Sequence, residues 1–169
     1  MVLSAVGGIL LVLDPSGSDG DSKDRNAVTS RANDFAVAYN TYDVVDLADY
    51  QKRLKGLLTP AYNKQFTQVT DAVFKALESK KQKSGGAKVL GTAVESIDQD
   101  SAVAIVAVDA KITNTDNDAE VLRHFRWKLS FEKTDGKWLI SNFESVAPVE
   151  AVATPDPSAS PSATEGGAE

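Results

Sequence analysis

The sequence contains no cysteine and a single histidine, His124. Disulfide bonds and thiolate metal sites are therefore excluded, and one imidazole cannot build a histidine-rich zinc site. The glycine pairs at 7–8 and 85–86 lack the lysine and the strand–turn–helix setting that a phosphate-binding loop needs. The GxSxG motif of serine hydrolases does not occur either. The sequence thus predicts no metal, no cofactor and no familiar catalytic motif.

The sequence also lacks an excess of positive charge, since its formal net charge is −6. Between Asp24 and Ala147, 17 lysines and arginines are balanced by 17 aspartates and glutamates, so the negative excess lies at the two ends. A nucleic-acid-binding domain would need a basic face. We therefore expect no nucleic-acid partner. The 169 residues, 42% of them hydrophobic, suffice for one domain with a real core.

The segment from Val121 to Val146 contains both tryptophans and three of the six phenylalanines. Apolar and polar residues alternate along its first part, and a period of two predicts a β-strand with one buried face. The apolar side holds Val121, Phe125, Trp127, Leu129 and Phe131, and the polar side holds His124, Arg126, Lys128, Ser130 and Glu132. His124 is therefore expected at the surface.

Asp135-Gly136 predicts a two-residue type I′ hairpin turn, because both residues tolerate a positive φ. With that turn, Phe131 faces Ile140, whereas Leu139 and Phe143 lie on the opposite, polar side of the sheet. A longer loop or a bulge would shift this register. Apolar residues on a wet face suggest a contact surface, so we predict an interface that includes His124, Arg126, Leu139 and Phe143.

Three helices are predicted before the sheet. The first covers residues 25–42 and has an apolar stripe at helical spacing, formed by Val28, Ala32, Phe35, Ala36 and Tyr39. The second covers about residues 46–58, with Asp46 as its N-cap. The third opens at Thr59-Pro60, a favoured cap and first position, and is expected to fray over residues 78–84 and to stop at the glycine pair 85–86. Its inward residues are Tyr62, Phe66, Val69, Val73 (or Phe74) and Leu77.

Two further strands are predicted at residues 87–97 and 101–113. The second of them is apolar on both faces from Ala102 to Val108, which indicates a central position in the sheet. Three helices followed by a four-stranded antiparallel meander is an α+β pattern. We expect the sheet to curve around the first helix.

The folded domain is predicted at residues 25–147. Residues 1–13 are uncharged and mostly apolar after Met1. A helix over Val2–Leu13 would span about 18 Å, less than the hydrocarbon layer of about 30 Å. We interpret this segment as a truncated or short membrane anchor, and the alternative is a terminal element packed on the domain. Residues 14–24 are expected to be a polar linker, and residues 148–169 a disordered acidic tail rich in proline, serine and threonine.

One carboxylate suggests a reactive pocket. If the loop at residues 114–120 is symmetric, Asp109 lies opposite Phe125 on the aromatic face, where a carboxylate beside apolar walls can act as a general base. The candidate pocket residues are then Tyr39, Asp109, Arg123, Phe125 and Trp127. The simpler interpretation is that Asp109 pairs with Lys111, Arg123 or backbone amides at the rim.

Several segments in a fixed order resemble the mammalian cell entry (Mce) associated membrane proteins of actinobacteria. They are Tyr42-Asp43 with the spaced Tyr50, Leu58-Thr59-Pro60, Val106-Ala107-Val108-Asp109, and Asp135-Gly136-Lys137-Trp138-Leu139. The resemblance runs from Arg25 to Val146. It implies a nuclear transport factor 2-like (cystatin-like) cone fold behind a single-pass anchor in the cell membrane, with the domain on the extracytoplasmic side. It also implies accessory work for the envelope lipid importers that Mce proteins build, and it brings no catalytic motif.

Three functions are compatible with these observations. The first is a non-enzymatic, membrane-anchored accessory protein that supports Mce-type lipid import complexes through protein–protein contacts. The second is a cone domain that binds a small ligand or lipid, with Tyr39, Phe125 and Trp127 lining the pocket. The third is an enzyme of the steroid-isomerase sort that uses Asp109. The fold itself does not decide among them.

Overall fold

A computed structural model of the chain describes residues 18–146. The expected anchor at 1–13 and the expected tail at 148–169 lie outside these residues. The elements are α1 (Ser18–Tyr39), β1 (Tyr42–Asp43), α2 (Leu47–Lys55), α3 (Pro60–Leu77), the 3₁₀ helix η2 (Glu78–Lys80), β2 (Lys83–Ile97), β3 (Ser101–Asn114), β4 (Asn117–Thr134) and β5 (Lys137–Ser145). The α+β class expected from the sequence is therefore confirmed.

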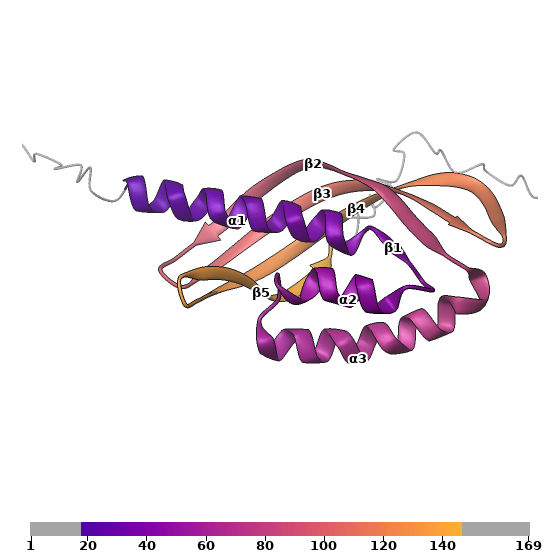
Figure 1. Cartoon of the computed structure of the whole chain (residues 1–169). Helices are drawn as coiled ribbons and strands as arrows, with labels where there is room; N and C mark the ends of the chain where they lie inside the picture. Colours follow the sequence, from indigo (N-terminus) through magenta and orange to yellow (C-terminus); the bar gives the residue numbers. More distant parts are fainter. Residues whose placement is uncertain (1–17, 147–169) are drawn as a thin grey trace, which may run out of the picture.

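The strands form one antiparallel sheet in the order β1-β2-β3-β4-β5, and Figure 1 shows its strong curvature. The predicted meander is confirmed for β2 to β5, with β3 at the centre. The predicted total of four strands is wrong, because β1 adds a fifth. The sequence assigned Tyr42 to the first helix, yet α1 ends at Tyr39, and Tyr42 and Asp43 pair with Ser84 and Lys83. The Lys83 ammonium lies 2.7 Å from the Asp43 carboxylate and fixes this short edge strand.

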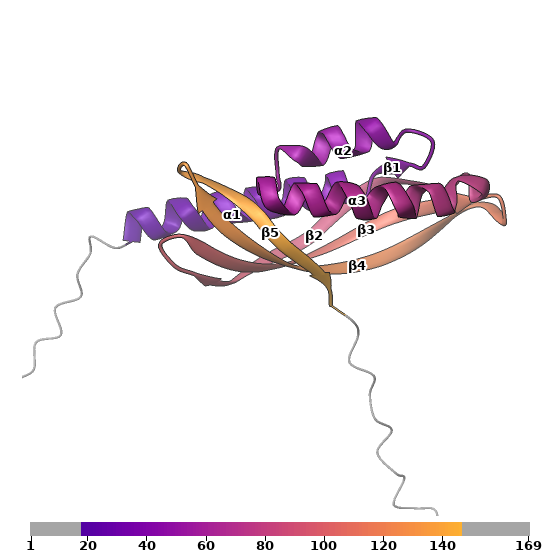
Figure 2. The same cartoon turned by 90° about the horizontal axis from the view of Figure 1, so that it is seen from below.

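The three α-helices cover one face of the curved sheet (Figures 1 and 2). The apolar stripe of α1 is confirmed, since Val28, Ala32, Phe35 and Ala36 are fully buried, and the helix packs mainly on β2 and β3. On the inner face of β3, five alternate residues are buried: Ala102, Ala104, Val106, Val108 and Ala110. The hydrophobic core therefore lies between these helices and the concave side of the sheet.

The predicted N-caps of the second and third helices are both confirmed. The Asp46 carboxylate accepts a hydrogen bond from the amide of Asp49 at 3.2 Å, and the Thr59 hydroxyl accepts one from the amide of Tyr62 at 3.3 Å. The chain between these helices is held to the sheet at Ile140, whose amide donates to the Leu57 carbonyl at 2.9 Å. The regular helix α3 ends at Leu77, where the sequence predicted that fraying begins. The predicted stop at the glycine pair is too late: after η2 the chain reverses at Lys81, which has a φ of 47°, and β2 begins at Lys83.

The polar linker predicted at residues 14–24 is wrong from Ser18 onward, where α1 begins. The physical reason is a tertiary contact of Asp24. Its carboxylate lies 2.6 Å from the Lys133 ammonium and accepts a hydrogen bond from the Trp138 indole at 3.1 Å. Acidic residues in the first turns also suit the positive end of the helix dipole. The part of the predicted linker from Ser18 onward is therefore helical and is held by the β4–β5 hairpin at Asp24.

The predicted turn between β4 and β5 is confirmed, since Asp135 and Gly136 have φ values of 49° and 73°. The pairing of Phe131 with Ile140 is also confirmed. Beyond it, an irregularity between Ser130 and Phe131 places Phe143 opposite Leu129. The predicted position of Phe143 on the outer face is therefore wrong, because one extra residue in a strand turns every following side chain to the other face.

The register between β3 and β4 also differs from the expectation. A tight turn pairs Asn114 with Asn117, and an irregularity between Ile112 and Asn114 shifts the remaining pairs. Asp109 consequently lies opposite His124, and Val108 lies opposite Phe125. The prediction that Asp109 lies on the aromatic face is therefore wrong. The carboxylate is on the outer face, where its Oδ1 is 2.6 Å from Nδ1 of His124.

Candidate functional site

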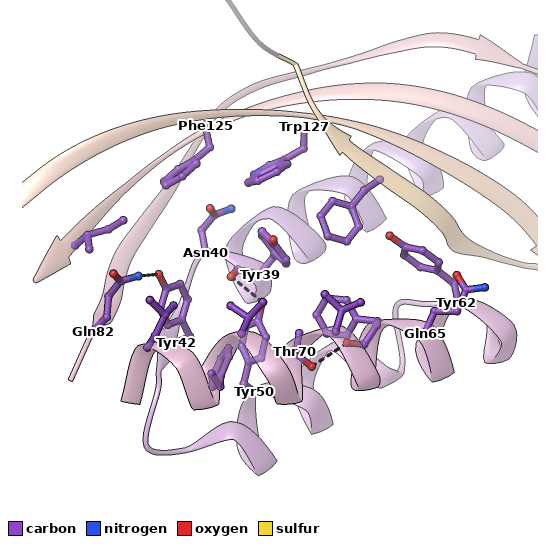
Figure 3. A pocket seen from close by; sticks show the side chains of 17 residues that line it. Tyr39, Asn40, Tyr42, Tyr50, Tyr62, Gln65, Thr70, Gln82, Phe125 and Trp127 are labelled. Atoms are coloured by element: carbon purple, nitrogen blue, oxygen red, sulfur yellow. Dashed lines mark hydrogen bonds between the residues drawn. The ribbon is translucent and has the colours of Figure 1, made fainter. Parts of the chain in front are cut away.

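A cavity of about 580 Å³ lies between α3 and the inner face of the sheet. Figure 3 shows side chains from α1, α2, α3 and β4 converging on it. The lining residues are Tyr39, Asn40, Tyr42, Tyr50, Tyr62, Gln65, Phe66, Val69, Thr70, Val73, Phe74, Leu77, Gln82, Ile112, Phe125, Trp127 and Phe143. None of these side chains carries a formal charge, so the wall is mainly aromatic and aliphatic, with three neutral amides and one threonine among its residues.

The aromatic wall is organised around Tyr39, at the end of α1. Its ring lies 4.9 Å from the Trp127 ring and 4.8 Å from the Phe143 ring, both edge-on, as centroid distances. On the sheet, Phe125 and Trp127 stack with their planes only 10° apart and their centroids 5.8 Å apart. Such contacts stabilise aromatic pairs beyond simple burial. The wall is therefore preorganised by ring–ring contacts among three elements of the fold.

Polar groups around the cavity are mostly engaged with the protein. Tyr50 donates its hydroxyl hydrogen to the carbonyl of Tyr39 at 3.2 Å, and the Gln82 amide donates to the Tyr42 hydroxyl at 2.6 Å. Thr70 donates to the carbonyl of Phe66 at 2.9 Å. These bonds fix the side chains and reduce the polar surface that they present to the cavity.

The mouth of the cavity is formed in part by two valines of α3. Val69 is 61% exposed and Val73 is 45% exposed, although both line the cavity. The sequence placed both on the inward side of the third helix. The buried residues of α3 are instead Phe66, Thr70 and Phe74, so the inward prediction is wrong for Val69, and Phe74 rather than Val73 is the inward residue. An apolar rim of this kind allows an apolar molecule to enter without crossing a charged barrier.

All four tyrosines of the chain line the cavity, and burial raises the pKa of each of them. The effect raises the pKa of Tyr39 to about 12, mainly because an ionised phenolate would lose its hydration in this apolar setting. The pKa of Tyr50 is raised further, again chiefly by burial. The tyrosines therefore present neutral hydroxyl groups at physiological pH.

The structure divides the five predicted pocket residues into two groups. Tyr39, Phe125 and Trp127 line the cavity, whereas Asp109 and Arg123 do not. Asp109 is on the outer face, and Arg123 is an exposed residue opposite Ala110. The cavity therefore has no carboxylate of the kind that the isomerase hypothesis required.

Three of the four predicted interface residues lie on the outer face of the sheet, and the fourth lines the cavity. His124 and Arg126 are exposed, and Leu139 is half-buried opposite Glu132 on the outer face. Phe143, in contrast, points inward and lines the cavity, where its ring is 4.9 Å from the Phe35 ring. The outer surface that can still be tested as an interface consists of His124, Arg126 and Leu139.

Several cavity residues were not proposed from the sequence as pocket residues. They include Tyr50, Tyr62, Gln65, Gln82 and Ile112. The inward stripes of the second and third helices contained the signal for Tyr50 and Tyr62, which face the sheet across the cavity. Gln82 and Ile112 carried no such signal, because only the pairing of β2 with β3 brings them to the cavity.

Within residues 18–146, no group of three or more potential metal ligands comes together. None of the helices in this part of the chain has both the length and the apolar character of a membrane crossing.

Solved structures show which fold this is. An IcmL-like type IV secretion system protein from Legionella pneumophila matches with a TM-score of 0.59 and 15% identity, over 75% of this chain and 96% of that one. The periplasmic domain of DotI matches with a TM-score of 0.57 and 17% identity, over 73% of this chain and 95% of that one. An Ntf2-like protein involved in plasmid conjugation has a TM-score of 0.51 and 15% identity, over 75% and 50% of the two chains. The fold is nuclear transport factor 2-like, as the resemblance implied.

The sequence comparisons are more specific. The Mycobacterium tuberculosis protein Rv1362c is 33% identical over 130 residues, which cover 75% of this chain. The chain spans 57% of the length of that relative. A family model described as "Uncharacterized protein Rv1363c/MT1408-like" matches residues 3–147, nearly the whole chain up to the tail. The chain is therefore a member of the Rv1363c/MT1408-like family.

Proposed function

We propose that this domain binds a small apolar molecule in the cavity between α3 and the sheet. The observation that carries the proposal is the cavity itself, about 580 Å³ of space with mainly aromatic and aliphatic walls, a few neutral polar groups and no charged lining residue. Ligand sites in proteins commonly have volumes of about 300–1,000 Å³ and mostly apolar walls with a few polar groups. This supports the second of the three functions considered from the sequence.

Binding would be driven by removal of apolar surface from water, which contributes about 25 cal/mol per Å². The rings of Tyr39, Trp127 and Phe143 are already fixed against one another. Binding would therefore cost the ligand its translational and rotational entropy but cost the protein little side-chain entropy, which favours affinity. The exposed valines 69 and 73 supply the apolar entrance.

The test uses N-phenyl-1-naphthylamine, a neutral probe whose fluorescence rises in apolar surroundings. We expect saturable enhancement with the wild-type domain, and weakening of at least about tenfold in Val69→Asp, which places a charge at the rim. Val37→Asp is the matched control, since Val37 is also an exposed helical valine, at 41%, but does not line the cavity. Absence of enhancement, or equal loss in both variants, would contradict the proposal.

A second proposal concerns the cellular location and the partner proteins of this domain. We propose that the chain is a non-enzymatic accessory protein of the cell envelope, anchored through residues 1–13 with its domain outside the cytoplasm, and associated with Mce-type lipid importers. Two observations support it. The family match extends into the N-terminal segment, beginning at residue 3. The same fold occurs in the periplasmic domain of DotI and in an IcmL-like secretion protein.

The contact surface proposed for this role is the outer face bearing His124, Arg126 and Leu139. Leu139→Asp should reduce co-purification with Mce proteins from actinobacterial membranes by at least severalfold, because it places a charge at an apolar contact. Leu90→Asp is the control, since Leu90 is a leucine of β2 that is 56% exposed. Unchanged co-purification of the Leu139 variant would be evidence against this surface.

A further inference from the structure

One buried polar side chain in the wall of the cavity has an acceptor that the protein leaves open. Asn40 directly follows α1, is only 3% exposed and lines the cavity. Its Nδ2 donates a hydrogen bond to the carbonyl of Ala36 at 2.7 Å. Because a carbonyl only accepts, the nitrogen of the amide must face Ala36, and the oxygen Oδ1 is left on the other side. No hydrogen bond among the described residues ends on that oxygen.

A ligand in the cavity can reach this oxygen. Among the described side chains that are not exposed, the indole nitrogen of Trp127 is the one nitrogen or oxygen that both lacks a partner and is closed to water. Oδ1 of Asn40 lacks a partner but is not closed to water, although the residue as a whole is buried. Figure 3 shows the amide group of Asn40 directed toward the rings of Phe125 and Trp127 in the cavity. The open surface of Oδ1 therefore belongs to the cavity wall.

The main chain fixes Asn40 in this position. Its carbonyl accepts a hydrogen bond from the Ser84 hydroxyl of β2 at 2.6 Å, and its amide donates to the Ala36 carbonyl at 3.2 Å. The other buried polar residue of the wall, Thr70, both donates and accepts hydrogen bonds within the protein through its hydroxyl. Native proteins rarely leave a buried polar atom without a partner, because its lost hydration is unfavourable. Asn40 thus presents a fixed acceptor that a bound molecule could satisfy.

The neutrality of the wall restricts what can bind there. The lining has no lysine, arginine or histidine to neutralise an anion and no carboxylate to neutralise a cation. Moving an unpaired charge into an apolar setting costs far more than moving a neutral polar group. The tyrosines cannot supply a charge either, since burial raises the pKa of each. A ligand in the cavity should therefore be uncharged.

We infer that the cavity takes an uncharged, mainly apolar molecule that carries a hydrogen-bond donor, such as a hydroxyl group, and that this donor bonds to Oδ1 of Asn40. The inference rests on the proposed binding function and deepens it by naming the ligand class. A hydrocarbon, or a molecule whose polar atoms only accept, would leave the oxygen without a partner. An ammonium group would donate the bond but would bury its charge without an anion.

Four probes with one fused-ring body test this inference: 2-naphthalenemethanol, 2-(methoxymethyl)naphthalene, 2-ethylnaphthalene and (2-naphthyl)methylammonium. Their end groups are a neutral donor, an acceptor without a donor, an apolar group and a charged donor. Dissociation constants are measured by equilibrium dialysis at pH 7.5 for the wild type, Asn40→Leu and Thr70→Val. Leucine has nearly the size of asparagine but no acceptor. A change in cavity shape affects the alcohol and the similarly sized ethyl compound alike, so the readout is the ratio of their dissociation constants.

We expect Asn40→Leu to raise the alcohol-to-ethyl ratio by about three- to tenfold, the range of one net hydrogen bond, and to leave the ether-to-ethyl ratio unchanged. Thr70→Val is the control and should change neither ratio, because the Thr70 hydroxyl is already engaged. The ammonium probe should bind the wild type at least about tenfold more weakly than the alcohol. The inference is overturned by an unchanged alcohol ratio in Asn40→Leu, an equal rise with the ether or in Thr70→Val, or ammonium binding as tight as that of the alcohol.

A spectroscopic measurement on the wild type serves if Asn40→Leu does not fold. The ¹³C signal of the Asn40 side-chain carbonyl should move downfield with the alcohol and not with the ethyl compound, because accepting a hydrogen bond deshields a carbonyl carbon. If both probes bind and this signal does not distinguish them, the inference fails and the binding function stands. If none of the probes binds, the binding function itself fails, and the inference fails with it.

Discussion

Asp24 of α1 and Trp138 of β5 are joined across 114 positions of sequence by a hydrogen bond of 3.1 Å from the indole nitrogen to the carboxylate. The same carboxylate lies 2.6 Å from the ammonium of Lys133, which itself lies 5.1 Å from the centre of the Trp138 ring. This cluster ties the first turns of α1 to the tip of the β4–β5 hairpin. It holds the end of the segment that had the composition of a linker against the sheet.

The cluster predicts a pH dependence. The Lys133 hydrogen bond and the Trp138 hydrogen bond hold the pKa of Asp24 below its ordinary value of 3.8. Because the folded-state pKa is lowered, the stabilisation is present above about pH 4 and is lost as the pH falls through the folded-state value. Asp24→Asn should therefore lower the melting temperature near pH 7, and the difference from the wild type should shrink as the pH falls below about 4. Asp21→Asn, on the same helix, is the control, and an equal effect of both variants would contradict the prediction.

Phe35 is predicted to be a principal support of both core and cavity. Its side chain is fully buried and its ring contacts those of Tyr39 and Phe143. Phe35→Ala should lower the free energy of unfolding by about 3–5 kcal/mol, because it leaves a large void. Val37→Ala on the same helix, where the side chain is 41% exposed, should cost about 1 kcal/mol or less. Urea denaturation of the two variants measures this difference, and similar costs would show that Phe35 is not a core residue.

The tyrosines predict the behaviour at alkaline pH. Since burial raises the pKa of Tyr39 to about 12 and raises that of the other three, the folded state binds these protons more tightly than the unfolded state. The resulting stability is fully present below about pH 10 and is lost as the pH rises through the folded values. Absorbance at 295 nm should show little tyrosinate at pH 10 while the protein is folded. Full ionisation near pH 10 without loss of circular dichroism would contradict the buried arrangement.

Replacing glycine by alanine should have opposite effects on stability at Gly136, in the β4–β5 turn, and at Gly20, in α1. Gly136 has a φ of 73°, so Gly136→Ala should destabilise the protein by about 1 kcal/mol or more. Gly20 lies in α1 with open space around it, and Gly20→Ala should stabilise by up to about 1 kcal/mol. Thermal unfolding gives both signs, and a stabilised Gly136 variant would rule out the left-handed conformation at the turn.

Much of the fold follows from sequence patterns that act locally. The helical stripe from Val28 to Tyr39, the caps Asp46 and Thr59, the alternation along β4 and the Asp135-Gly136 turn each depend on neighbouring residues. The period of a pattern identifies the element and its buried face without reference to the rest of the chain. The aromatic wall of Tyr39, Phe125 and Trp127 could be predicted for this reason.

Only the tertiary structure decided which residues meet across the strands. Two irregularities, near Asn114 and Ser130, set the registers that place Asp109 on the outer face and Phe143 in the cavity. A shift of one residue reverses the face of every side chain that follows, and no local pattern records it. In the same way, the contact of Asp24 with Trp138 joins two segments that are 114 positions apart in the sequence. The sequence thus determined the elements and their apolar faces, whereas pairing between distant segments determined the chemistry of the cavity, because its neutrality depends on where Asp109 points.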